Sequence, residues 1–567
     1  MAGSALDLTL ALDVRSLPPG APARAHLIAE VSAALPEEDR DERPPLALVF
    51  AVDVSASMAG APIEHVVRSI ERMVELLDPT DRVGVVVFSE GAEVVSELEP
   101  LDASVRRKLV SSLRRIDPEG ATDIESGLRV SSASLSPRRP GERQGILLLS
   151  DGSPTRGEPR PEALADLAGA MRPDITVSTL GYGEEHNEDI LRRIAVAGGG
   201  RYHYVRDPAL CASDLARAVG EQGDALAEAV TLVLTPEPGV EIVRVASDVR
   251  VTISPEGARI ELPDLLGGDR LPIVAEIAIA NPVTADGSMP LVRAVLTHRR
   301  PGTAGEPHRS DRALAVDLVP GAAVPDVEAR ARVLIALADE ARDEARKLAD
   351  QQLFDRAAER LRRAVEVMRA EPQTEADPEL AETIEQLAEE ADVLASKPNP
   401  AAYRLFRKRQ AALALSRRGD QMSLGGPLSR RAMAGIAGNL PPARLVMTGD
   451  GAGPQTVYRL DGQSITIGKT NLAQIRLDAE GVARQHCMIV GQDGKFYAKD
   501  PGGGSATLIN GRPLAEPKPL VQGDVLRIGG IELRYEEEGD KRGGASPGGQ
   551  RADGGPGTPK NSGERAG

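Results

Sequence analysis

The sequence predicts a multidomain protein that combines a doubly wound, Rossmann-like α/β domain with two β-sandwiches and a helical segment. The chain has 567 residues, which is more than one hydrophobic core usually supports. The apolar runs LALVFAV, VGVVVFS, ILLLS and ITVSTLG alternate with amphipathic stretches such as IEHVVRSIERMVELL. Buried strands separated by helices indicate a parallel sheet covered on both faces. We therefore assign residues 45–222 to the α/β domain.

Residues 1–44 and 223–322 are expected to form one β-sandwich. Near the N-terminus, LDLTLALDV and RAHLIAEVSAA alternate apolar and polar residues around the break SLPPGAP, which predicts two strands and a turn. The same alternation returns from EAVTLVLTP to RALAVDLVP. Because two strands alone are too few to be stable, we predict that they pair with the later strands. The α/β domain would then be an insertion in this sandwich.

The C-terminal half changes character several times. Residues 323–418 show helical periodicity with acid-base pairs four residues apart, which predicts a helical hairpin or bundle. Its last stretch, AAYRLFRKRQAALALSRR, is a basic amphipathic helix, either a solvated connection or a surface for an acidic partner or membrane. Gly, Ser and Pro in 419–442 predict a linker, short strands in 443–538 predict a second sandwich, and the polar tail 539–567 predicts disorder.

Composition excludes several classes of protein. The net charge of −17 argues against nucleic-acid binding, because there is no basic excess to displace counterions from phosphates. The two cysteines, Cys211 and Cys487, lie far apart and indicate neither a disulfide framework nor a zinc site. The first residues lack the basic and apolar regions of a signal peptide, and no stretch is long enough to span a bilayer. We expect a cytoplasmic protein.

A metal site is predicted at one edge of the α/β sheet. The strand LALVFAV runs directly into Asp53, Ser55 and Ser57, and open α/β sheets bind ligands at this strand end. Carboxylate and hydroxyl oxygens are ligands that Mg²⁺ prefers, with Mn²⁺ or Ca²⁺ as alternatives. Thr122, before a helix, and Asp151, after ILLLS, would complete the set. The alternative is that these residues merely cap the helices that follow.

These five residues resemble the metal-ion-dependent adhesion site of von Willebrand factor A (VWA) domains, with Asp-x-Ser-x-Ser followed by a separate Thr and a separate Asp. The later run TLGYGEEHNEDILRRIAVAGGGRYHYV also looks like a strand-helix-strand segment of this family. The resemblance implies a bound divalent cation with an open coordination position. It further implies that a partner protein fills this position with a carboxylate.

The segment from SITIGKT to IELRYE resembles a forkhead-associated (FHA) domain, a β-sandwich that binds phosphothreonine peptides through its loops. The scaffold positions of that family are matched by Gly468, His486, Asn510 and Gly511. The resemblance assigns peptide contacts to Lys469, Arg484, Ser505 and Thr507.

Three of the phosphopeptide positions depart from the family pattern. Lys469 stands where Arg is usual, Ala483 replaces a phosphate-binding Ser, and Ser505 replaces an Asn. Losing a hydrogen bond to a charged group costs about 1.5 to 3 kcal/mol, so these changes weaken phosphate binding. Two alternatives stay open: a phosphothreonine-binding module, or a sandwich that docks another protein.

Together these features predict a non-catalytic cytoplasmic adaptor that binds a partner protein through the metal site and another through the FHA-like domain. A metal-dependent hydrolase is one alternative, since a bound metal can activate water. Against it, the chain contains no G-x-S-x-G or H-E-x-x-H motif. A self-assembling structural protein is the other alternative. The segment DGQSITIGKT does not fit a nucleotide-binding P-loop, because five residues separate its glycines instead of four.

Overall fold

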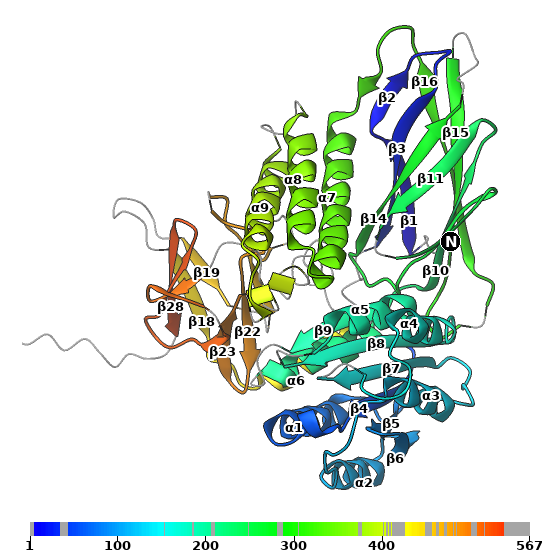
Figure 1. Ribbon diagram of the computed structural model, residues 1–567. Coiled ribbons are helices and arrows are strands. Elements are labelled where there is room, and N and C mark those ends of the chain that lie inside the picture. The colour runs from blue at the N-terminus through cyan, green and yellow to red at the C-terminus, as the bar shows by residue number, and fades with distance from the viewer. Residues whose placement is uncertain are drawn as a thin grey trace, which may run out of the picture.

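The α/β domain is inserted between strands of the first β-sandwich, and the helical bundle and the C-terminal sandwich follow along the chain (Figure 1). The structure is a computed structural model. It describes residues 5–34, 43–151, 154–183, 186–205, 210–247, 249–280, 287–303, 305–371, 377–400, 402–403, 406–407, 410, 426–447, 456–460, 464–469, 473–479, 481–483, 485–500, 507–514 and 516–537. The predicted tail 539–567 lies outside the described residues.

The first sandwich is built from the two chain segments that precede and follow the inserted α/β domain. One sheet has the order β1-β3-β14-β11, and the other has the order β12-β13-β10-β15-β16-β2-β17. The strand β3 pairs antiparallel with β1 on one side and with β14 on the other, so the N-terminal strands belong to this sandwich. The strands are β1 (Leu6–Leu12), β2 (Val14–Leu17), β3 (Ala23–Ala33), β10 (Glu228–Pro236), β11 (Val240–Ala246), β12 (Arg250–Ser254), β13 (Gly257–Glu261), β14 (Arg270–Ile279), β15 (Gly287–Arg299), β16 (His308–Leu318) and β17 (Val324–Pro325).

The α/β domain contains a six-stranded sheet of order β6-β5-β4-β7-β8-β9, in which all neighbours are parallel except β5 and β6. Its strands are β4 (Leu46–Asp53), β5 (Arg82–Phe88), β6 (Ala92–Pro100), β7 (Arg143–Ser150), β8 (Ile175–Tyr182) and β9 (Gly199–Val205). Its helices are η1 (Ala56–Met58), α1 (Ala61–Leu76), α2 (Ala103–Leu113), α3 (Ile124–Ser134), α4 (Pro161–Gly169), α5 (Glu188–Ala197) and α6 (Cys211–Gly223). Apolar clusters pack on both faces, which confirms the predicted doubly wound fold.

Buried ion pairs join the α/β domain to the first sandwich at the amino ends of its parallel strands. Arg143, at the start of β7, pairs with Asp264, whose carboxylate also accepts a hydrogen bond from Thr176 at 2.6 Å. Arg201 on β9 pairs in the same way with Asp269. These contacts leave the opposite edge of the sheet, where the carboxyl ends of the strands lie, to the loops of the α/β domain.

The helical segment forms a bundle of α7 (Val327–Asp350), α8 (Phe354–Arg369) and α9 (Pro378–Ala395) around its own apolar core. At its first turns α7 also packs on the first sandwich, through Ala329 and Val333. Of the predicted basic helix, the described residues 402, 403, 406, 407 and 410 are helical, and the others lie outside the described residues. Tyr403 and Phe406 are buried in the bundle core. This placement favours the connecting role over a membrane surface.

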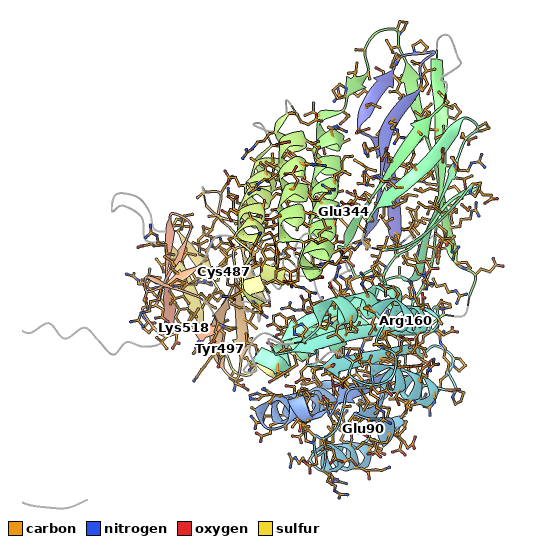
Figure 2. All side chains as sticks on the ribbon, viewed as in Figure 1. Glu90, Arg160, Glu344, Cys487, Tyr497 and Lys518 are labelled. Atoms are coloured by element: carbon orange, nitrogen blue, oxygen red, sulfur yellow. The ribbon has the colours of Figure 1, made fainter. Side chains whose placement is uncertain are left out.

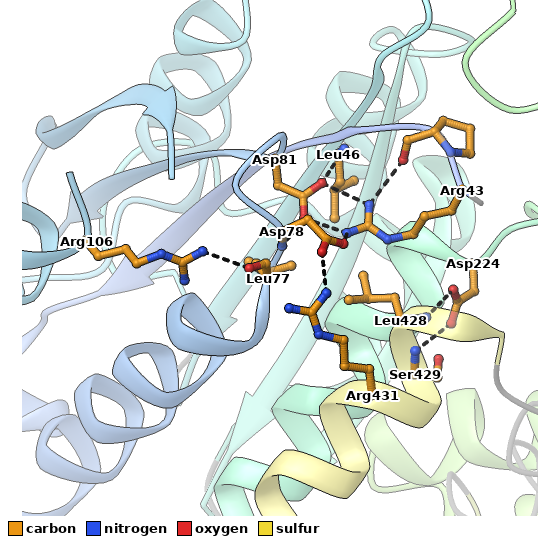
Figure 3. Close-up of polar contacts among 11 residues, drawn as sticks. Arg43, Leu46, Leu77, Asp78, Asp81, Arg106, Asp224, Leu428, Ser429 and Arg431 are labelled. Atoms are coloured by element: carbon orange, nitrogen blue, oxygen red, sulfur yellow. Dashed lines mark hydrogen bonds and ion pairs between the residues drawn. The ribbon is translucent and has the colours of Figure 1, made fainter. Parts of the chain in front are cut away.

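The predicted linker 419–442 is wrong for residues 427–437, which form the helix α11 (Pro427–Ala437). Its apolar face, including Ala432 and Ile436, is buried in the core of the α/β domain beside α1 and α6. Asp224 accepts hydrogen bonds from the backbone amides of Leu428 at 2.9 Å and Ser429 at 2.7 Å, and thereby caps the helix (Figure 3). Tertiary contacts stabilise a segment whose composition resembles a linker.

Arg43 lies where the chain enters the α/β domain, and it shares an ion-pair partner, Asp78, with Arg431 of α11. Arg43 donates to both carboxylate oxygens of Asp81, and Asp81 also accepts the amide of Leu46 at 2.9 Å (Figure 3). Arg431 of α11 pairs with Asp78 on the same turn. The entry strand, the turn and α11 are thus held by one ionic cluster.

The C-terminal sandwich has two sheets, of order β19-β18-β28-β27-β24-β25 and β21-β20-β22-β23-β26. Its strands are β18 (Ala443–Met447), β19 (Val457–Arg459), β20 (Ser464–Gly468), β21 (Ile475–Arg476), β22 (Cys487–Gln492), β23 (Lys495–Lys499), β24 (Leu508–Ile509), β25 (Arg512–Pro513), β26 (Lys518–Pro519), β27 (Val525–Ile528) and β28 (Ile531–Glu537). Met488 and Val490 of β22 join the core that contains α11. A half-buried ion pair of 3.1 Å between Lys499 and Asp214 adds a second contact with the α/β domain.

Among the described residues, no helix combines the length and the apolar character that a membrane crossing requires.

Glu228, at the start of β10, provides a test of the contact between the sandwich and the α/β domain. It is 5% exposed, and burial raises its pKa from 4.5 to about 7, although the positive charge of Arg143 opposes this shift. Between these values the unfolded state loses a proton that the folded state keeps, so the stability contribution of this group falls as pH rises. The Glu228→Gln variant carries no titrating group here, so its free energy of unfolding should not fall with pH in this way. We expect the difference from wild type to reach about 3 kcal/mol at pH 8. Native-state hydrogen exchange of the β10 amides at pH 5 and pH 8 would measure it, and an equal difference from wild type at both pH values would contradict it.

Candidate functional site

Asp53 ends the buried strand β4 and is itself fully buried. One carboxylate oxygen accepts a hydrogen bond from the amide of Ser55 at 2.9 Å, and the other accepts one from the hydroxyl of Ser150 at 2.6 Å. These two donors fix the orientation of the carboxylate. The loop after β4 therefore starts from a rigid anchor.

A chain of side-chain hydrogen bonds leads from this loop to the next strand end. The hydroxyls of Ser55 and Ser57 lie 3.1 Å apart, and Ser57 donates to the carboxylate of Asp151 at 2.8 Å. Ser55 is buried, whereas Ser57 is exposed. Four of the five predicted metal ligands thus lie in one cluster that reaches the surface.

Thr122, the fifth predicted ligand, lies on the loop before α3. This loop is held against the loop after β4, because the amide of Glu119 donates to Val54 at 2.8 Å and the amide of Ala56 donates to Gly120 at 3.2 Å. The amide of Thr122 donates to the hydroxyl of Thr155 at 2.9 Å. Three loops at the carboxyl edge of the sheet therefore carry all five residues.

The helix-capping alternative does not describe these side chains. Ser55 precedes the short helix η1 without a side-chain capping hydrogen bond. Gly60 is the N-cap of α1, and Asp123, which accepts from the amide of Ser126, is the N-cap of α3. The N-cap of α4 is Arg160. Asp53, Ser55, Ser57 and Asp151 are instead linked to one another by hydrogen bonds.

The electrostatics of the cluster suit a divalent cation. Burial raises the pKa of Asp53 to about 6, and the negative charge of Asp151 raises it too, against the hydrogen bonds from Ser150 and Ser55. Burial also raises the pKa of Asp151. Two partly desolvated carboxylates that repel each other are stabilised by a nearby positive charge. Because the described residues contain no cluster of three or more His, Cys, Asp or Glu side chains suited to a metal, hydroxyl ligands would be needed here.

Sequence reasoning missed two residues that position the cluster. Ser150 is the last residue of β7 and holds Asp53, and Thr155 holds the loop of Thr122. Ser150 lies directly before the predicted ligand Asp151. Its adjacency to Asp151 was the available signal. Thr155 had no comparable signal, since its contact depends on how the loop folds.

The C-terminal sandwich arranges its predicted scaffold residues around two loops. His486 is buried, and its Nδ1 accepts the amide of Ala483 at 3.0 Å. The amide of Lys469 donates to Ala483 at 3.0 Å, which joins the loop after β20 to the loop before β22. Asn510 has a positive φ of 52° and binds both Asp524 and the amide of Val525. Half-buried Lys469 lies at the end of β20 beside these loops.

Among the remaining predicted peptide contacts, the role predicted for Thr507 is wrong. Thr507 is fully buried, and its hydroxyl donates to the carbonyl of His486 at 3.2 Å. Buried in this way, Thr507 supports the loop instead of facing a peptide. Arg484 and Ser505 lie outside the described residues. Gly511 follows Asn510 with a φ of 78° and completes the turn.

The α/β sheet with its loop cluster and the C-terminal β-sandwich fit a protein that combines a VWA domain with an FHA domain. Residues 47–217 match the model of the von Willebrand factor type A domain, and residues 465–529 match that of the FHA domain. The chain therefore contains both domains, which confirms the two resemblances. VWA and FHA domains are typically protein-interaction domains.

Three relatives illustrate the extent of the likeness. A von Willebrand factor type A structure from Catenulispora acidiphila shares the fold with a TM-score of 0.52 and 18% identity, covering 69% of this chain and 90% of that chain. An uncharacterized protein of Synechocystis sp. is 30% identical over 204 residues, which are 36% of this chain and 47% of that protein. The inter-alpha-trypsin inhibitor heavy chain H4 of Homo sapiens is 29% identical over 31% of this chain and 20% of its own length. The chain thus spans less than half the length of these two curated relatives.

The hydrogen bond from Ser150 to Asp53 yields a prediction for metal binding. Groups that orient metal ligands typically contribute about 10-fold to 100-fold in metal affinity. We expect Ser150→Ala to weaken Mg²⁺ or Mn²⁺ binding about 10-fold while the fold is kept, as measured by calorimetry and circular dichroism. Ser131→Ala is a matched control, because Ser131 is also buried in this domain but its hydroxyl has no hydrogen-bond partner among the described residues. Equal affinities of the two variants would contradict the positioning role of Ser150.

Proposed function

We propose that this chain is a non-catalytic adaptor that binds one partner protein through a divalent cation on its VWA domain and docks another through its FHA domain. The observation that carries the proposal is the hydrogen-bonded cluster of Asp53, Ser55, Ser57 and Asp151 at the carboxyl edge of the sheet. Open α/β sheets bind their ligands at this edge.

In this proposal Asp53, Ser55, Ser57, Thr122 and Asp151 hold Mg²⁺, or Mn²⁺ or Ca²⁺ in its place. Two carboxylates and three hydroxyls form an oxygen-only set of the kind that these hard cations prefer. The cation supplies a positive charge for a carboxylate of the partner. The exposed hydroxyl of Ser57 and the half-buried Asp151 give the partner access from the surface.

The FHA domain is proposed to take either a phosphothreonine protein or another protein surface. Lys469 supplies a positive charge next to the amide network of Ala483 and His486, which supports an anion site. A lysine offers a point charge where a bidentate arginine would give two parallel hydrogen bonds, so phosphate affinity should be modest.

We also propose a cytoplasmic location and no nucleic-acid partner. Cys211 and Cys487 are buried free thiols in two different domains, and such thiols suit a reducing compartment. The negative net charge of the chain disfavours contact with phosphate backbones.

The metal site is tested by Asp53→Ala. Removing this buried carboxylate should abolish Mg²⁺ and Mn²⁺ binding in calorimetry and leave the far-ultraviolet circular dichroism spectrum unchanged, because the apolar cores on both faces of the sheet are kept. Asp166→Ala serves as the control, since Asp166 is a largely exposed carboxylate on α4 of the same domain. Unchanged metal affinity in Asp53→Ala would rule out the assigned site.

Peptide titration decides between the two uses of the FHA domain. If the domain binds phosphate, a phosphothreonine peptide should bind the full chain more tightly than the plain peptide, and Lys469→Ala should weaken it about 10-fold or more. The control is Lys495→Ala, because Lys495 is exposed at the opposite end of the same sheet. Equal affinity for both peptides would assign the domain to protein docking.

A further inference from the structure

Arg156 is attached to the loop of Thr122, one of the proposed metal ligands. The amides of Thr155 and Arg156 both donate to the carbonyl of Thr122, at 3.0 and 3.2 Å. Gly157 follows with a φ of 70°, and a Cβ there would lie 2.3 Å from an oxygen of Asp123. The chain can therefore turn away closely after Arg156, and the Arg156 side chain is more than half exposed on the loop that also carries Asp151.

The guanidinium of Arg156 pairs with Glu90, which lies on the turn between β5 and β6. Its Nη1 lies 2.8 Å from Oε2 of Glu90, and both side chains are more than half exposed. Glu90 lies against Gly120, where a Cβ would come within 2.9 Å of its side chain. Gly120 in turn accepts the amide of Ala56 on the loop after β4. The pair thus joins the loop after β7 to the turn between β5 and β6, which lies against Gly120 on the loop of Thr122.

Acidic side chains lie on the described loops near Arg156. Glu90 is exposed on the turn between β5 and β6, Glu119 is exposed on the loop of Thr122, and Asp53 and Asp151 lie in the cluster itself. Among the described residues of these loops, Glu90 and Glu119 would repel the carboxylates of a partner, whereas a bound cation and Arg156 would attract them. The loop after β7 therefore carries both a proposed metal ligand, Asp151, and the guanidinium of Arg156.

Arg160, on the same loop, forms more hydrogen bonds with its acidic partner than Arg156 does. Arg160 binds Glu158 through Nε at 2.9 Å and Nη2 at 2.7 Å, and its amide donates to the same carboxylate. The Arg160 pair lowers the pKa of Glu158 to about 2. Arg156 contacts Glu90 through a single nitrogen, across a gap in sequence of 66 residues. Glu90 and Arg160 both lie on the α/β domain in Figure 2.

From this geometry we infer that Arg156 is a specificity-determining residue that binds a second carboxylate of the partner, after the first has bound the cation. Glu90 occupies Arg156 until the partner replaces it. The inference rests on the proposed function and adds the class of partner, which is a segment that carries two acidic residues. Exposed ion pairs are weak enough to be exchanged in this way.

The test uses the full chain and synthetic glycine peptides that contain one glutamate, or two glutamates at increasing separation. Peptide affinity is measured by ligand-observed magnetic resonance in saturating Mg²⁺. Replacing Mg²⁺ with Mn²⁺ broadens the signals of the glutamate nearest the metal and so identifies it. The variants are Arg156→Ala, Glu90→Gln and the control Arg160→Ala.

We expect the best two-glutamate peptide to bind wild type about two- to fivefold more tightly than the one-glutamate peptide. Arg156→Ala should lose this preference and keep the affinity for one glutamate, whereas Glu90→Gln should increase the preference. Arg160→Ala should match wild type. A preference that survives Arg156→Ala, or none in wild type, would overturn the role of Arg156 alone. If Mg²⁺ strengthens binding of no peptide, the proposed metal-dependent function fails as well.

Discussion

The pairing of β3 with β14 is the constraint on which the architecture depends. Ala23 to Ser32 of β3 lie beside Ile279 to Arg270 of β14, so the sandwich closes a loop that contains the whole α/β domain. Both ends of the inserted domain must therefore leave from the same side. The parallel sheet meets this requirement, because β4 begins and α6 ends near the amino edge, where Arg43 and Asp224 hold the two connections. The opposite edge is left to the candidate metal site.

The α/β fold and most of the candidate site could be predicted because their signals are local. A buried strand followed directly by Asp53, Ser55 and Ser57 is visible in a short stretch of sequence, and the register of β4 and β7 then brings Asp151 alongside. Ser150 was missed because its one local signal, its adjacency to Asp151, does not show that its hydroxyl reaches Asp53. Thr507 was assigned to the wrong role because a sequence shows the hydroxyl and not its burial.

The helix α11 shows why composition alone failed in the region between the bundle and the C-terminal sandwich. Its N-cap partner, Asp224, is about 200 residues away in sequence and thus lies outside any local window. Gly435, which weakens a helix in isolation, allows close approach, since a Cβ there would lie 2.2 Å from Leu76 of α1. Residues typical of a linker are here the residues that permit tight packing between two helices.

The position of α11 also determines which substitutions in this protein affect one another. Its side chains share one core with α1, α6 and β22, so substitutions in any of these elements alter the packing of the others. Domain shuffling usually exchanges modules joined by segments that contact neither neighbour. Here the joining segment belongs to the interior of one module and supports the other. A substitution in the facing surface of one domain should therefore be felt by the other through α11.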